Sequence, residues 1–200
     1  MRRELGMLQS RLGTTTIYVT HDQDEALSLS DRIAVMRDGK VVEIGTPHAL
    51  YLAPRHLFTA EFLGQTELLP ARSVTREGDT LRVETSIGTL RVANDVEEPS
   101  GRTVMIRPEH IEFAAPGDSG PNPVEGRIAQ VAFTGRVVEY AVATGSTTLS
   151  VHALSGSMFD QGEAVRLRLP PERCVLVGDS NDDHDEPERG HHAARPRGES

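Results

Sequence analysis

The stretch Ile17-Tyr18-Val19-Thr20-His21-Asp22-Gln23-Asp24-Glu25-Ala26-Leu27 decides how this chain is interpreted. Its apolar centre, preceded by threonines, predicts a parallel strand over Thr14–Thr20 that is covered on both faces. The acidic residues that follow predict a helix whose N-terminus is capped by Thr20 or Asp22. His21 then stands at the carboxyl end of a strand, which is where ligands of open α/β sheets bind.

The segments on either side of this stretch also predict helices and one hairpin. Before it, an apolar stripe (Met1, Leu5, Leu8 and Leu12) predicts an amphipathic helix that ends at Gly13. After it, Asp38-Gly39 predicts a two-residue turn between strands Ile33–Met36 and Val41–Ile44. Thr46-Pro47 predicts the start of a helix that ends near Ala53, and a further short helix is expected over Leu57–Leu63, stopped by Gly64.

Short strands replace helices after about Gln65. Alternating or apolar runs separated by turn residues predict strands over Ala71–Val74, Leu81–Thr85, Thr89–Val92, Thr103–Ile106, Gly126–Phe133, Val137–Ala143, Thr148–His152, Ala164–Leu169 and Cys174–Val177. This spacing indicates a small all-β barrel or sandwich. The polar end from Asp179 is expected to be disordered. The fold class is therefore α/β plus all-β, divided into residues 1–66, 67–178 and 179–200.

Composition limits the classes of function. The formal net charge of −9 argues against a nucleic-acid-binding surface, which needs a basic stripe. A single cysteine, Cys174, excludes an internal disulfide and is compatible with a reducing compartment. The sequence has no apolar run of the ~20 residues that a transmembrane helix needs, and no secretory signal follows Met1.

The run around His21 resembles the switch-histidine segment of ATP-binding-cassette (ABC) ATPases, in which a strand ends in Thr-His-Asp before a helix with Glu-Ala. The agreement continues through Ser30–Met36, Asp38-Gly39, Gly45–Pro47, Leu50-Tyr51 and Phe62–Gly64. It is most similar to the importers of sugars, polyamines, ferric iron or sulfate. In that subgroup a regulatory β region follows the ATPase: Arg107–His110 resembles its signature, and Val124–Val177 resembles its OB-like (TOBE) barrel. The resemblance implies that residues 1–66 are the C-terminal remnant of a P-loop ATPase domain.

The resemblance also implies a role for His21, which would contact the γ-phosphate of ATP and help to position the attacking water. The complete family domain uses ATP and Mg²⁺. The phosphate-loop motif Gly-x-x-x-x-Gly-Lys-Ser/Thr does not occur in this sequence. Its one Gly-Lys pair, Gly39-Lys40, falls in the expected hairpin turn instead. The resemblance places that loop, the signature motif and the Asp-Glu strand before Met1. We therefore expect that this chain alone neither binds ATP appreciably nor hydrolyses it.

The family implies membrane permease subunits and a second ATP-binding subunit as partners, a regulatory protein or ligand on the β region, and a cytoplasmic position at the inner face of the membrane. A different hypothesis is a non-enzymatic regulatory or dimerisation module built on the OB-like domain. The scarcity of aromatic residues disfavours an oligonucleotide-binding barrel. The lack of an evident nucleophile disfavours a self-contained hydrolase that uses His21 and Asp22, and these adjacent side chains would tend to point apart.

Weaker candidates have structural explanations. The carboxylates of Asp22, Asp24 and Glu25 are expected to favour a helix N-terminus rather than bind a metal. An ion pair is expected between Arg107 and Glu109, structural roles for His110 and His152, and an inert core position for Cys174. The histidines and aspartates of the tail (Asp182, Asp183, His184, Asp185, His191 and His192) match no defined metal site.

Overall fold

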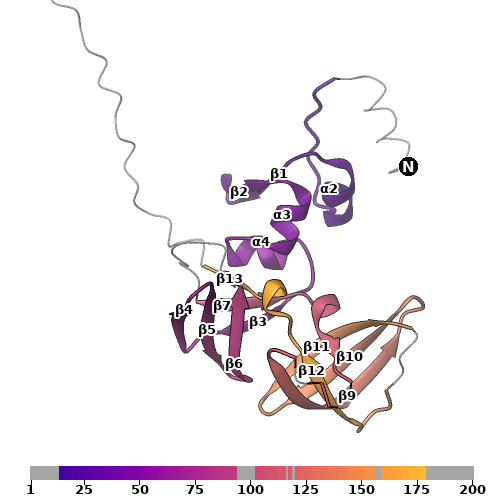
Figure 1. The fold of residues 1–200 in the computed structure, drawn as a ribbon. Helices are drawn as coiled ribbons and strands as arrows, with labels where there is room; N and C mark the ends of the chain where they lie inside the picture. The colour runs from indigo at the N-terminus through magenta and orange to yellow at the C-terminus, as the bar shows by residue number, and fades with distance from the viewer. Residues whose placement is uncertain (1–13, 94–101, 116, 119, 156–158, 179–200) are drawn as a thin grey trace, which may run out of the picture.

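The computed structural model describes residues 14–93, 102–115, 117–118, 120–155 and 159–178. The helix expected over Met1–Leu12 and the tail from Asp179 lie outside these residues. The helices and a two-stranded hairpin gather at one end of the molecule and a five-stranded sheet lies at the other, with β3, β7 and β13 between them (Figure 1). The described part of the chain is thus mostly β-sheet with few helices.

The strand expected over Thr14–Thr20 is absent, and this prediction is wrong for the described residues. The segment is assigned to no helix or strand and belongs to no sheet. Ile17 and Val19 are each 90% exposed and Tyr18 is 52% exposed. A strand is stable only when a neighbour takes up its backbone hydrogen bonds, and no described strand lies beside this one.

The elements that follow form where local sequence predicts them. Helix α2 (Gln23–Leu29) is capped by Asp22, whose Oδ1 accepts from the Glu25 amide at 3.0 Å. Strands β1 (Ile33–Arg37) and β2 (Lys40–Gly45) form the predicted hairpin. Both turn residues have positive φ, 52° at Asp38 and 76° at Gly39, as a type I′ turn requires.

Two short helices complete this end of the molecule. Thr46 caps α3 (Pro47–Leu52), and α4 (Leu57–Phe62) ends two residues before Gly64, whose φ is +157°. The small apolar core at this end consists of four buried side chains: Ile33, Val35, Leu50 and Leu63. Four partly buried side chains pack against it: Ala26, Leu27, Tyr51 and Phe58. None of the helices in the described part of the chain has the length and apolar character that crossing a lipid bilayer requires.

The β region contains three sheets. The five-stranded sheet has the order β11-β10-β9-β12-β8, and the two three-stranded sheets have the orders β13-β7-β3 and β4-β5-β6. The strands are β3 (Glu67–Pro70), β4 (Ser73–Glu77), β5 (Thr80–Thr85), β6 (Gly88–Ala93), β7 (Thr103–Ile106), β8 (Glu112–Phe113), β9 (Pro123–Phe133), β10 (Val137–Thr144), β11 (Thr147–Leu154), β12 (Ala164–Arg168) and β13 (Val175–Val177).

Most of these strands match the sequence prediction, but three points differ. The expected strand Ala71–Val74 is replaced by β3 and β4, which lie on either side of its first two residues. The short strand β8 was not expected. β13 pairs with β7, so the end of the segment expected to form one barrel, Val124–Val177, belongs to another sheet. These three differences depend on which distant strands pair with each other, and the local periodicity of the sequence does not indicate that pairing.

One apolar core joins the three sheets. It contains buried side chains from β3, β5, β6, β7 and β9 to β12, including Val104, Ile106, Val142 and Leu167. Strand β7 contributes to two cores, because Val104 and Ile106 belong to this core whereas Met105 packs with Ala60 and Val177 beside α4. At about 25 cal/mol per Å² of apolar surface, burial on both faces makes β7 a main source of stability where the helices meet the sheets.

Candidate functional site

His21 lies in a short turn that side chains of its own segment hold in place. The Thr20 hydroxyl accepts from the Asp22 amide at 2.9 Å and donates to Glu25 Oε2 at 3.0 Å. The Tyr18 hydroxyl donates to the same carboxylate oxygen at 2.8 Å. This hydrogen bond is the main reason that the pKa of Tyr18 is raised above its ordinary value. The turn therefore fixes the backbone on both sides of His21.

The His21 side chain is exposed at the tip of this turn. Among the described residues, no hydrogen bond or ion pair to its imidazole is found, although both neighbours of His21 are bonded. Geometrically, the imidazole is available to an external ligand, either as a hydrogen-bond donor or as an acceptor.

The carboxylates beside His21 act within the helix. Asp22 caps α2, and Asp24 and Glu25 lie in its first turn, where negative charge is favourable. Within the described ranges, no group of three or more His, Cys, Asp and Glu side chains could hold a metal ion. The polar residues of the tail lie outside those ranges.

Arg107 and Glu109 do not form the contact that the sequence predicted. Arg107 is only 1% exposed, and its guanidinium donates to backbone carbonyls rather than to Glu109. Glu109 Oε1 instead accepts from the Tyr51 hydroxyl at 2.7 Å. The expected ion pair is therefore replaced by a hydrogen bond to a helix 58 residues earlier, which sequence proximity could not indicate.

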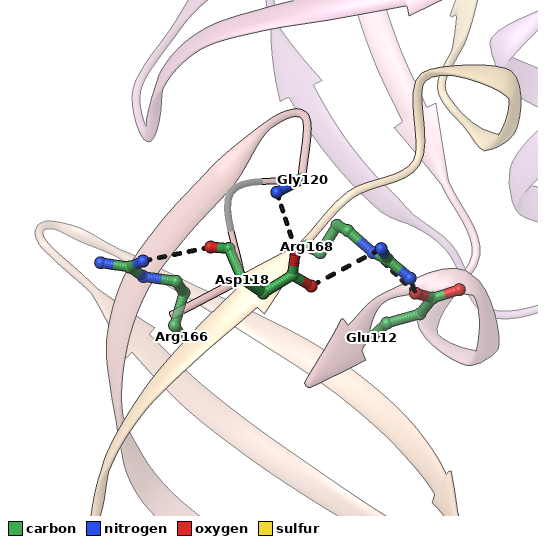
Figure 2. Close-up of polar contacts among 5 residues, drawn as sticks. All are labelled: Glu112, Asp118, Gly120, Arg166 and Arg168. Atoms are coloured by element: carbon green, nitrogen blue, oxygen red, sulfur yellow. Dashed lines mark hydrogen bonds and ion pairs between the residues drawn. The ribbon is translucent and has the colours of Figure 1, made fainter. Parts of the chain in front are cut away.

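A second polar cluster lies on the surface of the five-stranded sheet (Figure 2). Arg168 on β12 bonds Glu112 on β8, and its Nη1 lies 3.6 Å from Asp118 Oδ2. Asp118 Oδ1 accepts from the Gly120 amide at 2.8 Å, and the Asp118 carbonyl accepts from Arg166 at 3.3 Å. Each of these charged side chains already has a partner, so the cluster connects Asp118 and Gly120 to the side chains of β12.

The other single candidates lie in or beside the sheets of the β region. Cys174 is buried, and burial raises the pKa of its thiol to about 12, which makes it unreactive at neutral pH. Burial lowers the pKa of His110, whose amide donates to the Arg107 carbonyl at 2.9 Å. His152 lies in β11, paired with Glu139 of β10.

Comparison with known proteins connects these observations. Residues 104–177 match the family model described as "TOBE domain". The chain also matches import ATP-binding proteins, including the Fe(3+) ions import ATP-binding protein FbpC of Rhizobium etli, which is 37% identical over 181 residues. The chain is therefore related to the C-terminal part of ABC-importer ATP-binding subunits. It carries their TOBE domain.

The relatives are longer than this chain. The match to the Rhizobium etli protein covers 90% of the chain and 48% of that protein. The Spermidine/putrescine import ATP-binding protein PotA of Trichormus variabilis is 42% identical over 148 residues, which cover 71% of this chain and 39% of that protein. The chain thus spans at most about half the length of these ABC-importer relatives.

A comparison of folds finds the molybdate-bound structure of ModG, described as a cytoplasmic molybdate-binding protein. The TM-score is 0.46 with 9% sequence identity, over 57% of this chain and 95% of ModG.

Proposed function

We propose that this chain acts as the C-terminal part of an ATP-binding subunit of an ABC importer, with His21 as its contact to the γ-phosphate of ATP. The observation that carries the proposal is the imidazole of His21. It is exposed at the tip of a turn held by Thr20 and Asp22, within a chain related to import ATP-binding proteins.

The chemistry suits a neutral imidazole. Hydrolysis of ATP requires an in-line water and stabilisation of the charge that develops on the transferred phosphoryl group. A histidine N–H can donate one hydrogen bond to a γ-phosphate oxygen, and a fixed donor stabilises that charge without reorganising. The bonded neighbours Thr20 and Asp22 keep the backbone of His21 in place for this contact.

The residues present fit one phosphate contact and do not fit a magnesium site. Lys40, the only lysine, follows the β1–β2 turn and not a phosphate loop. The described residues lack a cluster of carboxylates and histidines for a metal. In this proposal, three further features come from the part of the related proteins that this chain does not span. They are the phosphate loop, the magnesium ligands and the carboxylate that activates water. No step through Mg²⁺ is assigned to the chain.

The proposed domains are a portion of the ATPase domain over 1–66, a regulatory OB-like (TOBE) domain over 67–178, and a tail over 179–200. The exposed apolar segment supports the view that the first is incomplete, since Ile17 and Val19 are each 90% exposed. On the hairpin, Met36 and Val41 face each other and are 56% and 51% exposed. Amide exchange tests this: strong protection across residues 17–20 in a monomer would contradict it.

The partners follow from the same proposal. A second ATP-binding subunit would complete the nucleotide sites, and membrane permease subunits would hold the pair at the inner face of the membrane. The β region would receive a regulatory protein or ligand. The names of the relatives point to iron or polyamine import, and the residues of this chain do not choose between them.

Two experiments test the assignment. In calorimetry, the chain alone is expected to show no micromolar binding of ATP, and micromolar binding would contradict the proposal. The chain is then joined to the N-terminal half of a related import ATP-binding protein. In that subunit, His21→Ala should lower ATP turnover by about 10²- to 10³-fold, the effect of losing one preorganised donor, with little change in ATP affinity.

A matched control is His48→Ala, because His48 is also exposed and lies in α3. It should leave turnover unchanged. Equal losses for His21→Ala and His48→Ala, or no loss for either, would contradict the role of His21.

The second candidate function is a regulatory or dimerisation module that needs no nucleotide. The observation in its favour is the core that joins all three sheets of the β region without any side chain from residues 14–66. If the joined subunit described above shows no ATP turnover with His21 intact, this alternative is preferred.

A further inference from the structure

Arg107 joins the helices to the sheets, and all the hydrogen bonds that its guanidinium donates to the helical part go to backbone carbonyls. It follows β7, and its Nε and Nη2 donate to the Tyr51 carbonyl at 3.2 and 3.1 Å. Its Nη1 donates to the carbonyls of Ala60, Gly64 and Gln65 at 3.0, 2.9 and 3.0 Å. These carbonyls lie at or just beyond the C-terminal ends of α3 and α4, where the last carbonyls of a helix have no intrahelical partner.

The charge of Arg107 is balanced without a direct ion pair. The ring of Tyr51 lies 4.3 Å from the guanidinium carbon, and the Tyr51 hydroxyl donates to Glu109. The C-terminal ends of α3 and α4 present the negative ends of their dipoles to the same cation. Burial lowers the pKa of Arg107, and the nearby Tyr51 and Glu109 oppose this shift. Loss of the cation would thus leave two helix ends unsatisfied at once.

A second connection lies at the other end of α4. The Leu57 amide donates to the Gly178 carbonyl at 2.8 Å, and the Gly178 amide donates to the Arg55 carbonyl at 2.9 Å. Between the two connections, Ala60 packs against Met105 and Val177. Helix α4 is therefore tied at its start to the end of β13 and at its end to Arg107.

We propose that Arg107 is a latch that makes the α3–α4 pair and the sheet β13-β7-β3 move as one body, so that a displacement of β7 is passed to both helices. The latch consists of the contacts above and involves neither His21 nor ATP. The latch would couple movements of the β region to the helical part, since β7 also contributes Val104 and Ile106 to the core of the three sheets.

Amide hydrogen exchange of the full chain tests the latch. In Arg107→Met, which keeps bulk but removes the donors, amides of α3 and α4 should exchange about 10- to 100-fold faster because several buried carbonyls lose their partner. Amides of β10 and β11, such as Val142 and Val151, should change less than about threefold if only the latch opens. Arg168→Met is the matched control, because Arg168 is only half-buried and pairs with Glu112 and Asp118.

Either of two results would overturn the proposal. An equal acceleration in the helices and in β10–β11 would show that Arg107 supports overall stability only. No acceleration in α3 and α4 would show that the helices do not depend on it. Should Arg107→Met fail to fold, Arg107→Lys is judged by the same comparison, because lysine keeps the charge but cannot bond both helix ends with a planar fork.

Discussion

Asn122 provides the sharpest test of how the sheets are held together. It is 5% exposed and precedes β9. Its Oδ1 accepts from the Arg91 amide at 2.6 Å, and its Nδ2 donates to the carbonyls of Arg91 and Leu169 at 2.7 and 2.9 Å. One amide side chain thus bonds β6 of one sheet to the residue after β12 of another.

The cost of Asn122→Ala follows from these contacts. Three hydrogen bonds at about 1 kcal/mol each amount to about 3 kcal/mol of lost stability. Asn122 also has a φ of +51°, which asparagine tolerates and alanine does not. This strain adds about 1 kcal/mol, for a total of about 4 kcal/mol. Asn122→Gly also removes the three hydrogen bonds, but glycine adopts a positive φ without strain. This variant should therefore cost about 1 kcal/mol less than Asn122→Ala.

Urea unfolding followed by circular dichroism measures these differences, with the slope of the transition checked for constancy. Gln130→Ala is the control, because Gln130 is exposed on β9, and it should change stability by less than about 0.5 kcal/mol. A loss below about 1 kcal/mol for Asn122→Ala would refute the reasoning, since a buried unpaired group costs at least that much. Equal losses for the alanine and glycine variants would refute the contribution of strain.

Three further changes test other parts of the structure. Gly126→Ala places a Cβ 2.6 Å from Val142 Cγ1, and urea unfolding should show a loss of about 1–3 kcal/mol from overpacking. The pKa of Tyr51 is raised from 10.0 to about 12, mainly by burial. Tyr51 therefore loses its proton at a lower pH in the unfolded chain than in the folded one, and stability falls as the pH rises from 10 to 12. In melting curves recorded over this pH range, Tyr51→Phe should make the fall shallower. Replacing Ile17 and Val19 with serine should improve solubility and change the melting temperature little, whereas a large drop would mean that these residues are buried in solution.

Local sequence predicted the helical end well because the signals there act within a few residues. The caps at Asp22 and Thr46 and the turn at Asp38-Gly39 need only their own neighbours, and all three are present. The same reasoning failed for Thr14–Thr20, whose composition predicts a strand. A strand also needs a partner, and composition does not say whether one lies beside it.

The candidate site was predicted only in part. The role of His21 stays a prediction from the pattern of residues around it, and the structure adds the turn that holds it and the exposure of its side chain. Arg107 was noticed for the wrong contact, because an adjacent carboxylate suggested an ion pair. Asn122 gave no signal, since an asparagine between two prolines is typical of a surface loop.

The sequence by itself determined the caps and the hairpin turn of the helical end, the acidic start of the helix after His21 and the relationship to import ATP-binding proteins. These depend on residue types and short spacings. Only the tertiary structure decided that three sheets share one core, that β13 pairs with β7, and that Arg107 and Asn122 connect segments tens of residues apart. The physical reason is that backbone groups of any residue type can bond a buried side chain, so the partner is chosen by packing and leaves no mark in the sequence.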